Sequence, residues 1–486
     1  MAKLADIGHA MAVLHWDKET YLPKKGGAAR GRQLATLGAI AHETFIDPDF
    51  GSLLKSLTQQ QSLSAKQKKN VQLTYKSYLK AKKFKSDFVR KKSLAINTAY
   101  SAWIAAREKN DYALYVEPLQ ALIDIVREEA EILGYEDHPY DACLDQYEPD
   151  MTVAILEPFF ASVKKDLKPL LRKIKKAKPI KARFLDKKYP KDDQWAFGLE
   201  VLKNIGYDFD AGRQDVSPHP FTTSFSPQDV RVTTRIDEYD LLNMTWSCIH
   251  EGGHALYEQG LPSEEYGLPS GSAISLSMHE SQSRLYENNV GRSYSYWTYL
   301  YPRLQKRFPK QLGKVSLDQF YKAINTVSPN EIRTEADELH YHFHVLIRYE
   351  IEKEIMEGKI QAADLKKVWN KKYKSYLGVT PRDDNHGILQ DVHWAHGSIG
   401  YFPTYSLGSF YAAQIYAKAE ATMPKLSSQL ARGRTKDLLK FLREEMHQYG
   451  KQYNAEEMCE KITGEPLNTR YFIEYAKAKY GEVYGL

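Results

Sequence analysis

The sequence predicts a mainly α-helical protein with one small β-hairpin. Apolar residues recur at helical spacing along most of the 486 residues. The short segments that interrupt this pattern contain Pro in contexts typical of interhelix loops, as at Leu261-Pro262 and Thr380-Pro381. One segment, residues 220–236, has strand chemistry instead. No repeat or low-complexity linker marks a boundary, so we expect a single domain over residues 1–486.

Five segments show the helical period most clearly, namely residues 30–45, 98–133, 153–176, 405–424 and 434–448. Two further helices are predicted over residues 238–259 and 272–289, and these carry the polar motifs considered below. Apolar residues make up 42% of the chain, which is enough for the helices to bury a sizeable core.

A β-hairpin is predicted over residues 220–236, immediately before one of these helices. Both of its ends are rich in β-branched and aromatic residues, which favour strands. Between them, Ser226-Pro227-Gln228-Asp229 has the composition of a turn. In the second strand, side-chain alternation places Val230 and Val232 on one face and Arg231 on the other.

The net charge of +6 does not indicate a nucleic-acid partner. Much of this charge comes from two Lys-rich runs, residues 65–93 and 164–191. Apolar residues interleave with the lysines of the first run, as expected for the solvated face of an amphipathic helix. The chain also has no RNA- or DNA-binding motif, so we expect no nucleic acid among its partners.

Cys143, Cys248 and Cys459 are the only cysteines, and they lie far apart without a CxxC pair. This pattern argues against a disulfide framework and fits a reducing compartment. The first residues lack the long apolar region of a signal peptide, and no run of about 18 apolar residues could span a membrane. We therefore expect a cytoplasmic protein with no membrane partner.

The strongest functional motif is His250-Glu251-Gly252-Gly253-His254, in the helix predicted over residues 238–259. Residues four apart project from the same helix face, so His250 and His254 can bind one metal ion. Glu251 lies beside the first ligand but offset, where a carboxylate can accept a proton from a water that the metal activates. The pattern is typical of zinc-dependent hydrolases, and the alternative is a surface helix with two unrelated histidines.

Gly252 and Gly253 argue against that surface helix. Each should cost a helix interior about 1 kcal/mol relative to Ala, so another interaction must offset the cost. Close approach of a second backbone or of a substrate is the usual reason for glycine at such positions. We therefore expect a crowded contact at this turn of the helix.

A catalytic zinc site normally has three protein ligands and one open position. Glu280 is the predicted third ligand, because it follows His254 at a distance that allows a loop and a returning helix. The neighbouring His279 is the competing ligand. Alternatively, Glu280 could simply pair with Arg284 one turn along the same helix.

The order of motifs along the chain resembles that of the carboxypeptidase Taq family of metallopeptidases. The opening segment, Trp16-Asp17-Lys18-Glu19-Thr20-Tyr21-Leu22-Pro23, is similar to the start of that family. The other similar segments follow in order: His219-Pro220-Phe221, Asp229-Val230-Arg231-Val232-Thr233, His250-Glu251-Gly252-Gly253-His254, His279-Glu280-Ser281-Gln282-Ser283-Arg284, Ile332-Arg333-Thr334-Glu335-Ala336-Asp337 and Gly387-Ile388-Leu389-Gln390-Asp391-Val392-His393-Trp394.

This resemblance implies a large helical body divided by a deep groove, with a metal at the floor of the groove and the small hairpin beside it. It also implies a homodimer that releases single C-terminal amino acids from peptides with broad specificity. The implied ligands of Zn²⁺, for which Co²⁺ often substitutes, are His250, His254 and Glu280, and the implied general base is Glu251.

An oxyanion donor is expected in the late segment 393–405, which contains two glycines and several aromatic residues. By analogy with related peptidases, Tyr405 is the first choice and Tyr401 the second. The alternative for each is a packed aromatic ring, since the chain contains 34 Tyr. We expect Gln390, Asp391, His393 and Trp394 to line or support the site, with a carboxylate such as Asp391 orienting a histidine.

A carboxypeptidase also needs a cation for the terminal carboxylate, and the planar guanidinium of Arg suits that task. Arg333 is slightly favoured over Arg231. Either residue could instead form a structural pair, Arg333 with Asp337 or Arg231 with an acidic residue of the groove. The hairpin could bind the peptide backbone as an added strand, with His219 at its start touching the substrate.

Two other functions share these residues. An endo-oligopeptidase or a dipeptidyl carboxypeptidase would use the same metal site and would differ only in product size. A helical scaffold that retains a metal without catalysis is the alternative from another class, and the intact Glu251 argues against it.

Overall fold

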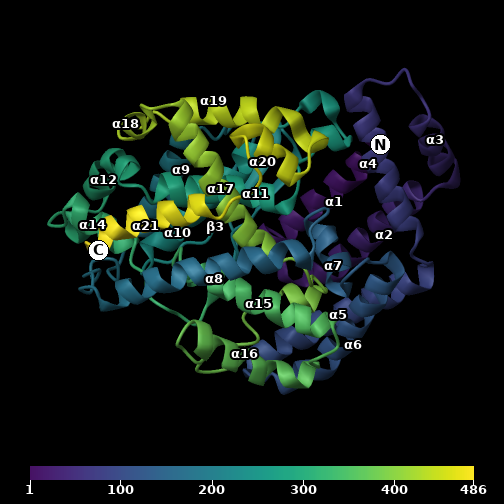
Figure 1. Cartoon of the computed structure of the whole chain (residues 1–486), viewed down its shortest axis with the longest axis horizontal. Helices are drawn as coiled ribbons and strands as arrows, with labels where there is room; N and C mark the ends of the chain where they lie inside the picture. The colour runs from purple at the N-terminus through teal and green to yellow at the C-terminus, as the bar shows by residue number, and fades with distance from the viewer. The chain divides into compact units, whose positions relative to one another are not determined.

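A computed structural model describes residues 1–486, and it is helical almost throughout (Figure 1). The chain divides into two compact units. The first contains Met1–Leu79, Pro179–Asn325 and Gly408–Tyr471, and the second contains Lys80–Lys178, Thr326–Leu407 and Phe472–Leu486. The predicted helical class with one small sheet is confirmed. No helix combines the length and hydropathy needed to cross a membrane.

The helices of the first unit are α1 (Ala2–Thr20), α2 (Gly27–Phe45), α3 (Pro48–Thr58), α9 (Lys191–Ile205), α10 (Leu241–Glu258), α11 (Leu276–Arg284), α12 (Tyr294–Arg307), α13 (Pro309–Leu312), α14 (Leu317–Ile324), α18 (Leu426–Leu430), α19 (Lys436–Glu445) and α20 (Ala455–Thr463). Three helices contain a boundary between the units: α4 (Ala65–Lys82), α17 (Pro403–Thr422) and α21 (Arg470–Tyr484).

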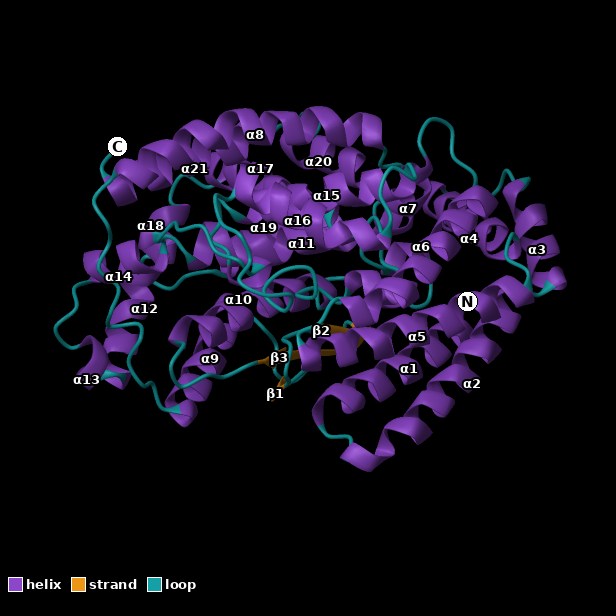
Figure 2. Cartoon of the chain, turned by 90° about the horizontal axis from the view of Figure 1, so that it is seen from below, coloured by secondary structure: helices purple, strands orange, loops and turns teal.

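The sheet of the first unit has three strands in the order β1-β3-β2. Strands β2 (Thr222–Ser226) and β3 (Asp229–Thr234) form the predicted antiparallel hairpin, with Val232 opposite Thr222. The strand β1 (Gln214–Val216) adds in parallel to β3 and was not predicted, because three residues carry no periodic signal. The sheet contacts α10 through β2 and β3, and β2 also contacts α1 (Figure 2).

Helix α10 is the centre of the first unit. It packs against α9, α11 and the sheet, and Leu241, Met244, Ile249 and Leu256 on it are almost completely buried. The Asp240 side chain caps the helix by accepting a hydrogen bond from the Asn243 backbone N–H at 3.0 Å, which explains why the helix begins after the predicted residue 238.

The second unit contains α5 (Ser86–Lys109), α6 (Ala113–Leu133), α7 (Pro139–Tyr147), α8 (Val153–Lys176), α15 (Tyr341–Met356) and α16 (Ala362–Tyr376). Helix α8 has the predicted bounds. The helical pattern over 98–133 is split between α5 and α6, because Asn110 adopts a left-handed conformation (φ 52°) that ends α5. Helix α15 packs against α7, α8 and α16 and is buried along nearly its whole length.

Candidate metal centre

Two adjacent helices of the first unit bring three candidate metal ligands together. His250 and His254 project from one face of α10, and Glu280 comes from α11. One ligand atom from each of these residues lies within 4.8 Å of the other two. The Oε2 atom of Glu280 is 3.6 Å from His250 Nε2 and 3.5 Å from His254 Nε2. Two imidazoles and one carboxylate form a donor set that fits a divalent metal of the zinc type.

The Nδ1 atom of His250 binds a carboxylate that the sequence analysis did not identify. This atom donates to Glu287 Oε2 at 2.8 Å, so the ring presents Nε2 to the ligand cluster. Glu287 is buried and also accepts from Arg284 at 3.1 Å and from Arg292 at 3.2 Å. Although burial opposes ionisation, Arg284 and His250 hold the pKa of Glu287 well below its usual range.

The Nδ1 atom of His254 lies 2.6 Å from Nδ1 of His279. The other ring nitrogen of His279 lies 2.8 Å from Glu258 Oε1. Both nitrogens of His279 therefore have partners, and His279 stands beside the three-residue cluster rather than within it. Burial lowers the pKa of His254 to about 4, which favours the neutral ring that a metal requires.

The two carboxylate oxygens of Glu280 have different partners. Oε1 accepts from Arg284 Nε at 2.6 Å, which is the pair that the sequence suggested as an alternative to metal binding. Oε2 faces the two histidines and accepts from Ser283 Oγ at 3.1 Å. The ion pair and the ligand geometry thus coexist. Against the effect of burial, Arg284 and His250 hold the pKa of Glu280 well below its usual range, so this carboxylate is ionised.

Glu251 is buried beside the cluster but is not part of it. Its Oε2 atom accepts a hydrogen bond from Thr222 Oγ1 at 2.6 Å, and the same hydroxyl lies 3.0 Å from the Glu251 carbonyl. Strand β2 therefore fixes the carboxylate. Burial raises the pKa of Glu251 above its ordinary value, although His250 and the Thr222 hydroxyl act in the opposite direction.

The predicted crowding at the glycine pair is confirmed. A Cβ atom on Gly253 would lie 2.6 Å from the Gln282 carbonyl oxygen and 2.7 Å from Ser283 Cα, both in the backbone of α11. A Cβ atom on Gly252 would meet only the side-chain ends of Ile205 and Leu202 on α9. Gly253 therefore lets α10 and α11 approach closely enough for their ligands to converge.

Two further features of the chain support Glu280 and its neighbours. A Cβ atom on Gly408 of α17 would lie 2.5 Å from Glu280 Cγ, so this glycine leaves space for the Glu280 side chain. After Arg284 the chain continues as a π-helical segment, Leu285–Gly291, which carries Glu287. Segments of π-helix are rare in proteins, and those that occur often lie at functional sites. Only a regular helix was predicted over residues 272–289.

Arg231 and His219 lie in the same unit as the candidate metal ligands but in different surroundings. The Arg231 guanidinium binds Asp229 through two hydrogen bonds of 2.9 and 2.8 Å, and it lies over the rings of Trp16 and Phe225. Its acidic partner is therefore its neighbour on β3. His219 is exposed in the loop before β2, where its carbonyl accepts from Ser217 Oγ at 2.6 Å.

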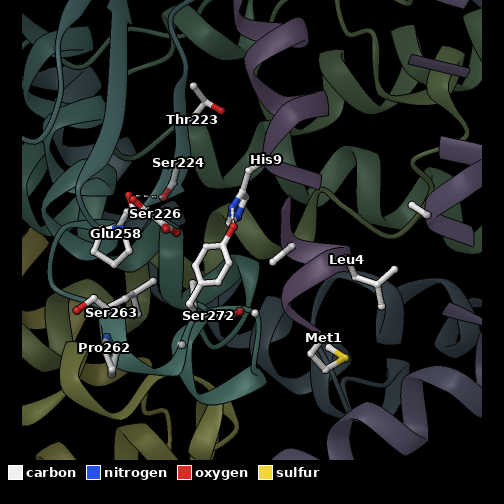
Figure 3. Close-up of a pocket in the computed structure, with 18 of the residues that line it drawn as sticks. Met1, Leu4, His9, Thr223, Ser224, Ser226, Glu258, Pro262, Ser263 and Ser272 are labelled. Atoms are coloured by element: carbon white, nitrogen blue, oxygen red, sulfur yellow. Dashed lines mark hydrogen bonds between the residues drawn. The ribbon is translucent and has the colours of Figure 1, made fainter. Parts of the chain in front are cut away.

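A cavity of about 810 Å³ adjoins strand β2 in the first unit (Figure 3). Its wall includes Thr222 and Ser224 of β2, Glu258 at the end of α10, and His9 of α1. Thr222 binds Glu251, and Glu258 binds His279. Two residues that support the candidate metal site therefore also line this cavity.

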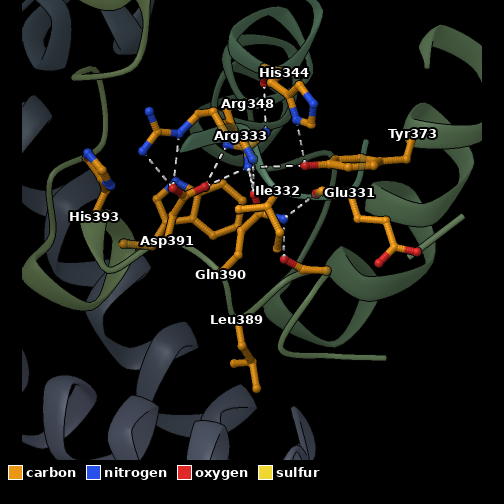
Figure 4. A network of polar contacts seen from close by, with 12 residues as sticks. Glu331, Ile332, Arg333, His344, Arg348, Tyr373, Leu389, Gln390, Asp391 and His393 are labelled. Atoms are coloured by element: carbon orange, nitrogen blue, oxygen red, sulfur yellow. Dashed lines mark hydrogen bonds and ion pairs between the residues drawn. The ribbon is translucent and has the colours of Figure 1, made fainter. Parts of the chain in front are cut away.

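In the second unit Arg333 is buried against Asp391 rather than paired with Asp337 (Figure 4). Its Nε and Nη2 atoms donate to Asp391 Oδ1 at 3.1 and 2.9 Å, and Nη1 donates to the Tyr341 hydroxyl. Arg348 Nε donates to the other oxygen of Asp391 at 2.7 Å. Asp391 thus orients two arginines, whereas Glu287 and Glu258 are the carboxylates that hold the histidines of the first unit.

Tyr405 and Tyr401 lie together in the second unit, with ring centroids 5.3 Å apart. The Tyr405 hydroxyl is 3.1 Å from His393 Nε2, and the Arg333 guanidinium lies 4.8 Å from the centre of the Tyr405 ring. Burial, with the charge of Arg333, lowers the pKa of His393 to about 3, so this ring is neutral.

The segment 393–402 before Tyr405 is tied to the core of the second unit by Glu352, which the sequence analysis did not single out. Its buried carboxylate accepts from Trp394 Nε1 at 2.7 Å, from the Gly400 backbone N–H at 3.0 Å and from the Tyr140 hydroxyl. Burial raises the pKa of Glu352 to about 7.

Residues 1–480 match the carboxypeptidase Taq (M32) metallopeptidase family. Carboxypeptidase 1 of Bacillus subtilis is 39% identical over 487 residues, covering 100% of this chain and 97% of that protein. Thermostable carboxypeptidase 1 of Thermus thermophilus is 40% identical over 498 residues, with the same two coverages. The crystal structure of the M32 carboxypeptidase from Deinococcus radiodurans has a TM-score of 0.97 and 38% identity, covering 100% of this chain and 98% of that chain.

Substituting Gly253 tests whether the contact between α10 and α11 assembles the ligands. We expect Gly253→Ala to lower the free energy of unfolding by about 1–3 kcal/mol, because the added methyl group meets backbone. It should also weaken metal binding. Gly252→Ala is the matched control, because its methyl group meets movable side chains. Urea unfolding and zinc titration of the metal-free proteins measure both effects, and equal behaviour of the two variants would refute the role of Gly253.

Proposed function

Because the chain belongs to the carboxypeptidase Taq (M32) family of metallopeptidases, we propose that it releases single C-terminal amino acids from peptides with the help of zinc. Membership of that family makes the chain a metal-dependent carboxypeptidase. The observation that carries the finer proposal is the cluster of His250, His254 and Glu280, with the buried Glu251 held next to it by Thr222.

His250, His254 and Glu280 are the proposed ligands. Two His and one Glu form one of the ligand sets found in catalytic zinc sites, which leave a further position open. Co²⁺ is expected to substitute, because it accepts the same nitrogen and oxygen donors. When bound, the metal would lower the pKa of a water towards about 7 and polarise the scissile carbonyl.

Glu251 is the proposed general base. Its carboxylate would accept the proton of the attacking water and then deliver that proton to the leaving amine nitrogen, so the group returns to its starting state. The hydrogen bond from Thr222 keeps the side chain in one orientation, and the raised pKa brings it closer to the value that suits proton transfer in both directions.

Tyr405 remains the first choice for the oxyanion donor, with Tyr401 as the second. Support comes from the way Tyr405 is held, between the neutral His393 and the guanidinium of Arg333. A hydroxyl in a fixed orientation can stabilise a developing negative charge without reorganisation.

Arg333 and Arg231 remain the candidates for the terminal carboxylate of the substrate. Each guanidinium is oriented by a carboxylate, Asp391 or Asp229, through Nε and Nη2. An Arg side chain has five N–H donors, so each residue keeps donors beyond those contacts. His219, exposed before β2, is proposed to touch the peptide when the substrate adds to that strand.

We further propose that residues 1–486 act as one catalytic domain, and the family match over residues 1–480 includes parts of both units. Broad specificity, a homodimer and a cytoplasmic location are proposed from the family resemblance, and three buried free cysteines are compatible with a reducing compartment. An endo-oligopeptidase or a dipeptidyl carboxypeptidase is the alternative, and it would release larger products.

The variant Glu251→Gln tests the proposed mechanism. We expect kcat to fall by about 10²–10⁴-fold, because the amide cannot accept the proton of water. Zinc should stay bound, since Glu251 lies outside the ligand cluster. Peptide turnover and the zinc content of the purified variant measure the two effects. Turnover equal to that of the unmodified protein would refute the role of Glu251.

Neutral variants of the two arginines identify the carboxylate anchor. The inhibition constants of one peptide are compared with a free and with an amidated C-terminus, in Arg333→Gln and in Arg231→Gln. Loss of the anchor should weaken binding of the free acid by about tenfold or more and leave the amide unchanged, because a charge-assisted hydrogen bond is lost. If both forms weaken equally in both variants, neither arginine is the anchor.

A further inference from the structure

The two histidines on α10 reach a carboxylate in different ways. His250 donates directly to Glu287 at 2.8 Å. His254 contacts another imidazole first, because its Nδ1 lies 2.6 Å from His279 Nδ1, and His279 Nε2 lies 2.8 Å from Glu258 Oε1. A second ring is thus inserted between the candidate ligand and its carboxylate.

Both helices contribute to this arrangement. Glu258 follows His254 by one helical turn, so the two side chains lie on the same face of α10. His279 comes from α11 and bridges them, with its ring centroid 4.6 Å from that of His254. The Tyr257 ring also packs against His279, with ring centroids 5.3 Å apart. His279 and Glu258 are largely buried, with side chains 20% and 17% exposed.

The direction of the hydrogen bonds follows from the chemistry of the end group. A carboxylate only accepts, so the proton between His279 and Glu258 belongs to His279 Nε2. At the other end, a His254 ring that binds a metal through Nε2 has its only proton on Nδ1, so His254 Nδ1–H donates to His279 Nδ1. The Nε2 atom of His254 is the one that faces Glu280.

We propose that His279 and Glu258 are positioning residues that hold the His254 ring with Nε2 towards the metal. The inference rests on the proposed zinc site and extends it to two residues outside the ligand set. It also explains the position of His279. The sequence suggests this residue as a competing metal ligand, but in the structure it contacts the candidate ligand His254. Partners of this kind typically change metal affinity by about 10–100-fold when they are removed.

The test measures the zinc dissociation constant of the metal-free protein by competition with a chromophoric chelator. We expect His279→Ala to raise this constant by about 10–100-fold. His279→Asn keeps an amide oxygen close to the former Nδ1 position, so it should accept from His254 and bind zinc within about threefold of the unmodified protein. His9→Ala, a substitution in the same cavity wall without contact to His254, should leave the constant unchanged.

Glu258→Ala tests the outer end of the same chain of contacts and keeps His279 packed on Tyr257. It should weaken zinc binding by about tenfold, and Glu258→Ala with His279→Ala should bind no more weakly than His279→Ala alone, because both act through His254 Nδ1. If His279→Ala does not fold, the zinc affinity of Glu258→Ala alone tests the positioning role.

Failure of the positioning role can be distinguished from failure of the proposed zinc-dependent function. Zinc constants within about twofold of the unmodified protein in both His279→Ala and Glu258→Ala would overturn the positioning role. Additive losses in the double variant would overturn it as well, since they would mean independent effects. If the unmodified protein itself binds no zinc, the proposed function fails instead.

Discussion

The contact between α10 and α11 at Gly253 is the constraint on which the proposed metal centre depends. A methyl group there would lie 2.6 Å from the carbonyl oxygen of Gln282, so only glycine lets the two backbones meet at this turn. The closeness of the helices brings Glu280 within 3.6 Å of both histidines and lets His279 reach behind His254. The loss of helix propensity at Gly253, about 1 kcal/mol, is thus offset by the assembly of the site.

The site also depends on the pairing of its buried carboxylates. Glu280 and Glu287 are both ionised in a nearly solvent-free environment, which is unfavourable unless each carboxylate is paired and hydrogen-bonded. Arg284 contributes to both, with Nε on Glu280 and Nη1 on Glu287. It therefore holds the carboxylate of the proposed ligand and the partner of His250 in one network. Glu251 is held by the neutral hydroxyl of Thr222, and burial raises the pKa of its carboxyl group.

Much of the fold could be predicted because its signals are local. Helix α8 has the predicted bounds because its apolar stripe is long and regular, and the hairpin of β2 and β3 followed from strand residues around a turn. The break at Asn110 was missed because Asn in a left-handed conformation lacks the strong signal of Gly or Pro. The partner of Arg333 could not be predicted, since Asp391 is brought to it by the fold and not by helical spacing. Glu258 could have been found, because it lies one turn after His254.

We propose that this protein, with a metal bound, releases one amino acid at a time from the C-terminus of a peptide. Mass spectrometry of a single peptide over time, before and after removal of metal with a chelator and again after addition of zinc, tests it most directly. The account predicts a ladder of products that each lack one more C-terminal residue, no ladder after chelation, and its return with zinc. Products that differ by two residues, internal fragments, or an undiminished ladder in the metal-free protein would contradict it.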